Sequence, residues 1–355
     1  MRFSCGFSKM REMKMRIGMC VLMAAALAPL GCKDSNNAAP AAAAPAPAPA
    51  MRVDRMDAGL DAVIAPDAKV EKVAGGFVFN EGPVWRAGRV WFSDLVGNKM
   101  YAVSPDGKVE LLIDKAGGMD NGAPGFYRGS NAMANDKDGT LLMCQHSLRR
   151  IARVDDKMKV TNFLDKWEGK KFNSPNDLVF APDGSLWFTD PPFGLDKKAD
   201  DPAKEIPFGG VFRYAKGKVT AVIKDLPNPN GIGFSPDGKY LYISNTAPHE
   251  FVNRYEVKAD GTLGQPTTFA SYPDNAPEPP DGLKLDSAGN LWTTGPGGIR
   301  IINPQGKVLG QIKLPEVAAN LAWGGDDGKT LYITASTGIY RVNALIPGEL
   351  PLYKK

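Results

Sequence analysis

The chain has 355 residues, of which 43% are apolar, and it contains 39 glycines and 29 prolines. This composition is typical of a soluble globular protein and favours many short strands joined by turns over long helices. The formal net charge is +4, but five of the 43 basic residues and one of the 39 acidic residues precede Cys32, so the rest of the chain carries 38 of each. A nucleic-acid-binding protein is therefore not expected.

The first 31 residues are typical of a secretory signal peptide. Basic residues are followed by an apolar run at 17–30 and then by Gly31 and Cys32. Such a run is too short to span a bilayer as a helix but has the length of a signal-peptide core. We expect an exported protein on the periplasmic side of the cell envelope, with Cys32 carrying a lipid anchor as its only membrane attachment. Cleavage and secretion without a lipid is the alternative.

Residues 32–66 are expected to form the anchor site and a flexible tether. The segment 38–50 reads AAPAAAAPAPAPA, which has no apolar periodicity and enough proline to stay extended. The folded domain is expected to span 67–355. Of its residues, Cys144 is the single cysteine, and its place in the run TLLMC predicts a buried apolar role.

Internal repetition is the dominant signal of this domain. Glycine-containing turns, each followed by a strand of alternating aromatic and β-branched residues, recur at 136–144, 181–190, 235–245, 286–295 and 325–335. Eight residues before the glycine of each turn stands Asn or Asp, and a sixth unit has Glu81 seven residues before Gly88. The positions so defined are Glu81, Asn131, Asn176, Asn230, Asp281 and Asn320, spaced 50, 45, 54, 51 and 39 residues apart.

Six units of this length with several short strands each predict an all-β fold, a six-bladed β-propeller. The last unit is short at its C-terminal end, and a strand-like segment at 70–76 precedes the first. We therefore expect the N-terminal strand to close the last blade.

The six polar positions open the first strand of each blade, and these strands line the central channel of a propeller. Two carboxylates and four carboxamides would then meet at one mouth of the channel. Oxygen ligands of this kind suit a hard divalent cation, Ca²⁺ first, with Zn²⁺, Mn²⁺ or Mg²⁺ as alternatives. Side chains that merely cap turns are the competing interpretation for each position taken alone.

A second set of positions follows from the return of each hairpin to the same face: Asp94, Gln145 with His146, Asp190 and Asn245. We expect His146 to contact substrate or to transfer a proton, although a lone histidine is more often structural. His249, in the loop after Asn245, is a weaker candidate.

The sequence resembles the gluconolactonase and senescence-marker-protein (regucalcin) family of six-bladed propellers. The resemblance covers about 70–343 and is most specific at EGPVW from Glu81, at 172–195, at Pro229-Asn230-Gly231 and at Pro280-Asp281-Gly282-Leu283. It implies one divalent metal with Glu81, Asn230 and Asp281 as direct ligands and Asn176 as a fourth ligand or substrate contact. Asn131 and His146 complete the expected substrate site. Ser174 stands where regucalcin-like members have an arginine that holds a sugar hydroxyl.

Together with these residues, the resemblance implies hydrolysis of a sugar-type lactone, a small molecule. The cation would polarise the ester carbonyl, Asp281 would take the proton of the attacking water, and Asn176 would orient the carbonyl or ring oxygen. Two alternatives remain open: phosphotriester hydrolysis at the same metal, and a non-catalytic propeller that binds a protein or glycan at the cell envelope. Propellers with a quinone cofactor have little support from a ring of acids and amides.

Overall fold

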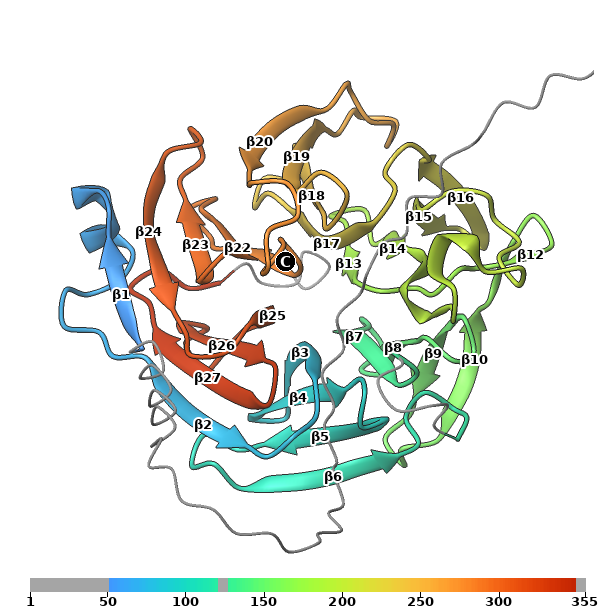
Figure 1. Ribbon diagram of the computed structural model, residues 1–355, viewed down its shortest axis with the longest axis horizontal. Helices are drawn as coiled ribbons and strands as arrows, with labels where there is room; N and C mark the ends of the chain where they lie inside the picture. Colours follow the sequence, from blue (N-terminus) through green and yellow to red (C-terminus); the bar gives the residue numbers. More distant parts are fainter. Residues whose placement is uncertain (1–50, 121–126, 349–355) are drawn as a thin grey trace, which may run out of the picture. The chain divides into compact units, whose positions relative to one another are not determined.

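A computed structural model of the protein describes residues 51–120 and 127–348. The described chain is built of short strands that form six four-stranded or five-stranded antiparallel sheets around a central axis, as Figure 1 shows. The predicted six-bladed propeller is confirmed. Within the described ranges, no helix is long and apolar enough to cross a membrane.

The first three blades follow the chain from the axis outward. Blade one holds β3 (Asn80–Arg86), β4 (Arg89–Asp94), β5 (Lys99–Val103) and β6 (Val109–Asp114). Blade two holds β7 (Ser130–Asn135), β8 (Leu141–Gln145), β9 (Arg150–Val154) and β10 (Val160–Leu164). Blade three holds β13 (Leu178–Phe180), β14 (Leu186–Asp190), β15 (Gly210–Ala215) and β16 (Lys218–Ile223). Between blades two and three lies a small hairpin of β11 (Lys166–Trp167) and β12 (Lys170–Lys171).

The other three blades repeat this order. Blade four holds β17 (Pro229–Phe234), β18 (Tyr240–Asn245), β19 (Phe251–Glu256) and β20 (Thr267–Ser271). Blade five holds β21 (Leu283–Leu285), β22 (Leu291–Gly295), β23 (Gly298–Ile302) and β24 (Val308–Lys313). Blade six holds β25 (Ala318–Gly324), β26 (Thr330–Ala335) and β27 (Gly338–Asn343), and its outer strand comes from the N-terminal side of the chain.

That outer strand is β2 (Glu71–Gly75), which pairs antiparallel with β27. The predicted closure of the last blade by an N-terminal strand is therefore confirmed. Joining the two ends of the domain in one sheet leaves no open seam between the first and the last blade.

The glycines from which the repeat was identified determine the backbone conformation of the hairpin turns. Every one of them has a positive φ, from 70° at Gly328 to 85° at Gly139. Glycine adopts this left-handed conformation without the steric cost that a Cβ atom brings. The repeat in the sequence thus marks the turn between the first and second strand of each blade.

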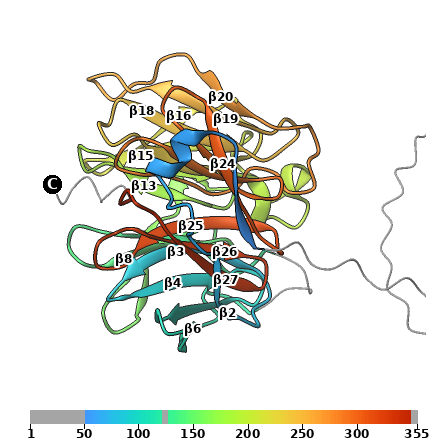
Figure 2. The same cartoon turned by 90° about the vertical axis from the view of Figure 1, so that its left-hand side faces the viewer.

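The folded domain begins earlier than the predicted boundary at residue 67. Strand β1 (Arg52–Arg55) adds a fifth strand to blade five by pairing with β24, and a 3₁₀ helix, η1 (Ala58–Ala62), follows it, as Figure 2 shows beside β24. Leu60 and Ile64 are fully buried. The expectation of a tether up to residue 66 is wrong for residues 52–66. The signal peptide, Cys32 and the tether at 38–50 lie outside the described residues.

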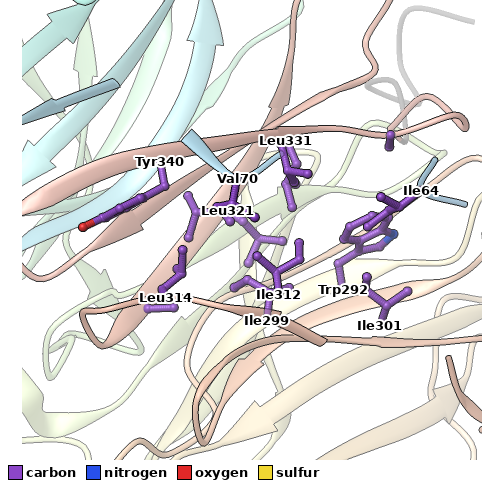
Figure 3. Packing of buried hydrophobic residues seen from close by; sticks show 14 of the residues in the cluster. Ile64, Val70, Trp292, Ile299, Ile301, Ile312, Leu314, Leu321, Leu331 and Tyr340 are labelled. Atoms are coloured by element: carbon purple, nitrogen blue, oxygen red, sulfur yellow. The ribbon is translucent and has the colours of Figure 1, made fainter. Parts of the chain in front are cut away.

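These N-terminal residues fill a space between blades five and six. Figure 3 shows Ile64 and Val70 among side chains of both blades, including Trp292, Ile312 and Leu331. Fully burying one such aliphatic side chain stabilises a fold by about 1.5–3 kcal/mol. Residues 52–66 thus contribute directly to the stability of the propeller.

Candidate active site at the channel mouth

The structure brings the six repeated polar side chains together at one end of the inner strands. The inner strands β3, β7, β13, β17 and β25 lie around the centre of Figure 1. Each of the six residues opens the inner strand of its blade or lies just before it. Five of the six residues expose 3% of their surface or less, namely Glu81, Asn131, Asn176, Asn230 and Asn320. Asp281 is partly exposed. We call these six residues the polar ring.

Hydrogen bonds within the polar ring show how closely its members converge. The Asn131 amide donates to Asn176 Oδ1 at 2.7 Å, and the Asn176 amide donates to Asn230 Oδ1 at 2.5 Å. On the other side, the Asn320 amide donates to Glu81 Oε2 at 3.2 Å. Turn capping alone does not explain these contacts, because their partners are ring members of neighbouring blades.

Irregular strand pairing turns these side chains toward the axis. The register between the first and second strand shifts at Glu81, near Asn131, at Asn230 and at Asn320. A β-bulge re-aims the side chains at its position, and bulges are frequent beside active sites. In blades three and five, Asn176 and Asp281 stand two residues before β13 and β21. The ring residues thus lie beside a register shift in four blades and just before the inner strand in the other two.

Glycines after three ring residues allow neighbouring inner strands to approach closely. A Cβ atom on Gly82 would lie 2.3 Å from Ala132 Cα, and one on Gly231 would lie 2.4 Å from the Asp281 carbonyl oxygen. On Gly282 it would lie 2.2 Å from Asn320 Cγ. Any larger residue would push the blades apart at the axis. The dipeptides Glu-Gly, Asn-Gly and Asp-Gly in the sequence therefore mark the tightest part of the channel.

Buried hydroxyl groups on the second strands fix the backbone of the ring. Ser93 donates to the carbonyl of Asn131 at 2.8 Å, Thr189 to that of Asn230 at 2.8 Å, and Ser244 to that of Asp281 at 2.6 Å. Each bond joins one blade to the next. The positions of the polar side chains therefore depend on the whole ring of sheets.

The two carboxyl groups of the ring resist ionisation in the absence of a positive charge. Burial raises the pKa of Glu81 to about 7, and the negative charge of Asp177 adds to the shift against hydrogen bonds from Gly82 and Asn320. Burial also raises the pKa of Asp281 well above its usual value, with the nearby Glu81 and Asp177 as further causes. A cation bound between Glu81 and Asp281 would favour their charged forms.

The donor atoms of the ring fit such a cation. Asp281 Oδ1 and Asn131 Oδ1 are buried and have no hydrogen-bond partner. The oxygens of Asn176 and Asn230 each accept one hydrogen bond, and a carbonyl oxygen has two lone pairs. In the part of the chain that the structure describes, no three His, Cys, Asp or Glu side chains form a metal-binding group. Carboxamide oxygens would therefore complete the ligand set, as they do for hard cations.

His146, the predicted substrate residue outside the polar ring, lies next to it. It is 1% exposed, its Nε2 lies 3.3 Å from the Asn131 amide nitrogen, and its Nδ1 is buried without a partner. Burial, aided by the charge of Lys198, lowers the pKa of His146 to about 4. At neutral pH the imidazole is uncharged, which suits a hydrogen-bonding contact better than proton donation.

The other members of the second predicted set have structural partners in the fold. Their side chains bind backbone groups of nearby loops. Asp94 accepts from the N–H groups of Val78, Phe79 and Gly97, and Asp190 from those of Asn173 and Ser174.

Asn245 and Gln145 act in the same way. Asn245 accepts from Asn228 N and donates to His249 O, and Gln145 donates to Ala116 O. The expected role of these four at the mouth is therefore wrong, because Asp94, Asp190 and Asn245 serve as acceptors for backbone N–H groups and Gln145 accepts from Arg150 while it donates to a backbone carbonyl. The His249 imidazole is exposed and lies 3.0 Å from Asp274.

Ser174, which stands where regucalcin-like proteins have an arginine, lies before β13, and its buried hydroxyl bonds to the loop that follows β14. Its hydroxyl donates to Pro191 O at 2.6 Å and accepts from Gly194 N at 2.9 Å. Gly194 also packs on His146, since a Cβ atom there would lie 2.8 Å from His146 Cβ. Ser174 therefore holds this loop against His146.

Sequence reasoning missed four residues near the ring. The Thr246 hydroxyl accepts from the Asn230 amide at 2.9 Å. Burial raises the pKa of Tyr127, and the charges of Asp281 and Glu81 add to the shift. Asp177 and Lys284 form a charged pair beside the ring. Asp177 directly follows Asn176, but neither spacing nor residue type distinguishes the other three.

Comparisons with known proteins agree with this geometry. A family model described as SMP-30/Gluconolactonase/LRE-like region matches residues 79–337. The gluconolactonase of Zymomonas mobilis is 33% identical over 306 residues, which cover 82% of this chain and 85% of that protein.

Solved structures with a similar fold include a gluconolactonase and a regucalcin. A gluconolactonase of Xanthomonas campestris is 30% identical with a TM-score of 0.72, covering 82% of this chain and 94% of that one. The calcium-binding protein regucalcin of Agrobacterium tumefaciens is 20% identical with a TM-score of 0.59, covering 78% and 95%, and shows the shared fold. With the model matched over most of the described blades and all six ring positions inside the matched range, the chain belongs to the SMP-30/gluconolactonase/LRE-like family.

Proposed function

We propose that this protein is a divalent-metal-dependent hydrolase that opens a sugar-type lactone at the polar ring. The observation that carries the proposal is the convergence of Glu81 and Asp281 with four carboxamides, with Asp281 Oδ1 buried and unpartnered. The lactone substrate is supported by the gluconolactonases of Z. mobilis and X. campestris, which are similar to this chain along most of their length.

Glu81, Asn230, Asp281 and Asn176 would hold the cation. When bound, it would supply polarisation of the ester carbonyl and a lowered pKa for water, with Ca²⁺ preferred by an all-oxygen ligand set.

The remaining chemistry belongs to side chains of the ring. Asp281 Oδ1 would accept the proton of the attacking water, because it is a carboxylate oxygen of the ring that no hydrogen bond of the fold engages. Asn176 would orient the carbonyl or ring oxygen of the lactone. Asn131, with its free Oδ1, and the uncharged His146 would bind sugar hydroxyl groups beside it.

The test is the variant Asp281→Asn, which keeps the shape of the side chain but removes the base. We expect kcat/KM for an aldonolactone to fall by about 10³ or more, within the range general-base removal produces. The matched control is Asp274→Asn, an exposed carboxylate next to His249 that lies outside the ring. Full activity of the Asp281 variant would exclude this assignment.

A substrate panel distinguishes the rival activities. Protein freed of metal by a chelator is refilled with Ca²⁺, Zn²⁺, Mn²⁺ or Mg²⁺ in turn and assayed on aldonolactones and on a fluorophosphate. Turnover of the fluorophosphate alone would favour a phosphotriesterase, and turnover of neither would favour a binding propeller.

We also propose that the protein is exported and anchored through Cys32. The basis is the sequence of the first 32 residues. Labelling with a radioactive fatty acid is expected to mark the full chain but not its Cys32→Ala variant. Label on both would contradict the anchor.

A further inference from the structure

Directly beside the polar ring lies a charged pair that joins two blades. Asp177 directly follows Asn176 in blade three, and Lys284 is on β21 of blade five. The Lys284 ammonium lies 3.6 Å from Asp177 Oδ2, although the inner strand of blade four stands between the two blades in the ring. Such a contact forms only inside the circle of inner strands.

The buried charge of Asp177 is compensated by Lys284. The Asp177 side chain is 3% exposed, its Oδ1 accepts from Leu178 N, and its Oδ2 has no hydrogen-bond partner. An unpaired buried carboxylate is costly, so the ammonium is its electrostatic compensation. Lys284 reaches it from the wall of a cavity of about 510 Å³ that continues the channel below the ring.

Both members of the pair also act on the ring. The charge of Asp177 raises the pKa of Glu81 and of Asp281, and the charge of Lys284 lowers that of Glu81. With a cation bound and all three acids ionised, Glu81, Asp177 and Asp281 carry three negative charges, and Lys284, 3.6 Å from Asp177, carries one positive charge. A divalent cation would bring the total charge of this group to zero.

From this balance we infer that Lys284 is a positioning residue that neutralises Asp177 and so adjusts the ring to a divalent rather than a trivalent cation. The inference rests on the proposed metal site. It adds that the Asp177–Lys284 pair determines which ion charge this site prefers. Without Lys284, the ring would present a third uncompensated negative charge. Coulomb energy is proportional to the charge of the bound ion, so a trivalent ion would gain 1.5 times as much free energy as a divalent one.

The experiment measures dissociation constants of Ca²⁺ and Tb³⁺ by calorimetry and by terbium luminescence, without substrate. For Lys284→Met we expect Ca²⁺ to bind about tenfold and Tb³⁺ about thirtyfold more tightly, in the ratio that Coulomb's law requires. For Asp177→Asn we expect shifts of similar size in the opposite direction. The double variant Asp177→Asn/Lys284→Met should return both constants to within about threefold of the original protein.

Opposite shifts separate a charge effect from damage to the fold, which would weaken binding in both single variants. Lys239→Met is the matched control, because Lys239 forms an exposed pair with Asp237 at 3.2 Å on a hairpin turn. If Lys284→Met does not fold, comparing Asp177→Asn with the double variant still measures the effect of the ammonium, and tighter binding in the double variant is expected.

Two outcomes overturn the inference in different ways. The inference is overturned, with the metal site left intact, if the ratio of the Tb³⁺ and Ca²⁺ dissociation constants is the same in all variants. It is also overturned if both single variants shift these constants in the same direction. Failure of the original protein to bind either ion would overturn the metal site and this inference together.

Discussion

Glu81 in the first blade accepts a hydrogen bond from the Asn320 amide in the sixth blade, at 3.2 Å and across 239 positions of the sequence. The bond joins the inner strands of the first and last blades, while β2 and β27 complete the last blade at its outer side. The same oxygen, Oε2, accepts from Gly82 N at 2.7 Å. One carboxylate is thus held by both the local turn and the last blade, so the closure of the fold and the geometry of the site depend on each other.

Stability of the metal-free protein should depend on pH through Glu81. Its pKa is about 7 in the folded state and 4.5 in an ordinary environment, so the folded state binds the extra proton between these values. The contribution is complete below pH 4.5 and is lost as the pH rises through 7, by about 3 kcal/mol. Urea unfolding with a chelator, compared between the original protein and Glu81→Gln, measures it. A difference that does not change with pH would contradict the buried, ionisable Glu81.

His146 should affect substrate binding more than turnover. For His146→Gln we expect KM to rise about tenfold with kcat within about threefold, the effect of one lost hydrogen bond to the substrate. Since the pKa of His146 is about 4, no loss of activity should occur near its ordinary value of 6.5. Steady-state kinetics between about pH 5 and 8 check both points. The exposed His249→Gln is the control, and a kcat effect confined to His146 would instead indicate proton transfer.

Blades four and five lie so close together at Gly231 that a larger residue should not fit there. In Gly231→Ala the new Cβ would meet the Asp281 carbonyl oxygen at 2.4 Å. We expect the free energy of unfolding to fall by about 3 kcal/mol, as overpacking in a rigid core does, and metal affinity to fall with it. Gly264→Ala, where the nearest atom would be 3.3 Å away, should change stability by less than about 1 kcal/mol. Urea unfolding measures both free energies of unfolding. Equal losses in the two variants would show that the inner strands can move apart to accommodate the new methyl group.

Residues 52–66 should stabilise the propeller although they precede the first blade. Leu60 is fully buried in the cluster between blades five and six, so Leu60→Ala should cost about 3 kcal/mol. Met56→Ala, at a residue that is 57% exposed, should change stability by less than about 0.5 kcal/mol. Thermal unfolding measures both, and an unchanged Leu60 variant would restore the interpretation of this segment as a tether.

Much of the fold could be predicted because its unit is local. Gly139 and Asn131 lie within one hairpin, and a turn glycine with alternating neighbours determines which face each strand residue takes. Repeating that hairpin six times predicts both the blades and the place where the polar ring lies. The buried apolar Cys144 could be recognised for the same reason, as one residue of an alternating strand.

The predictions that were wrong concerned residues whose role depends on contacts between distant parts of the chain. Leu60 and Ile64 look like two apolar residues in a polar segment until blades five and six form the space that they fill. Asp94 and Asp190 recur at equivalent positions because loop N–H groups need acceptors there, and repetition alone does not distinguish that need from a ligand role.

The sequence by itself determined the number of blades, the turns and the six residues of the polar ring, because strand alternation and turn chemistry act over a few residues. The tertiary structure decided the electrostatics of the site. The raised pKa of Glu81 and the pairing of Asp177 with Lys284 arise from burial and from distances between blades that are far apart in the chain. Those distances exist only after β2 and β27 have closed the ring.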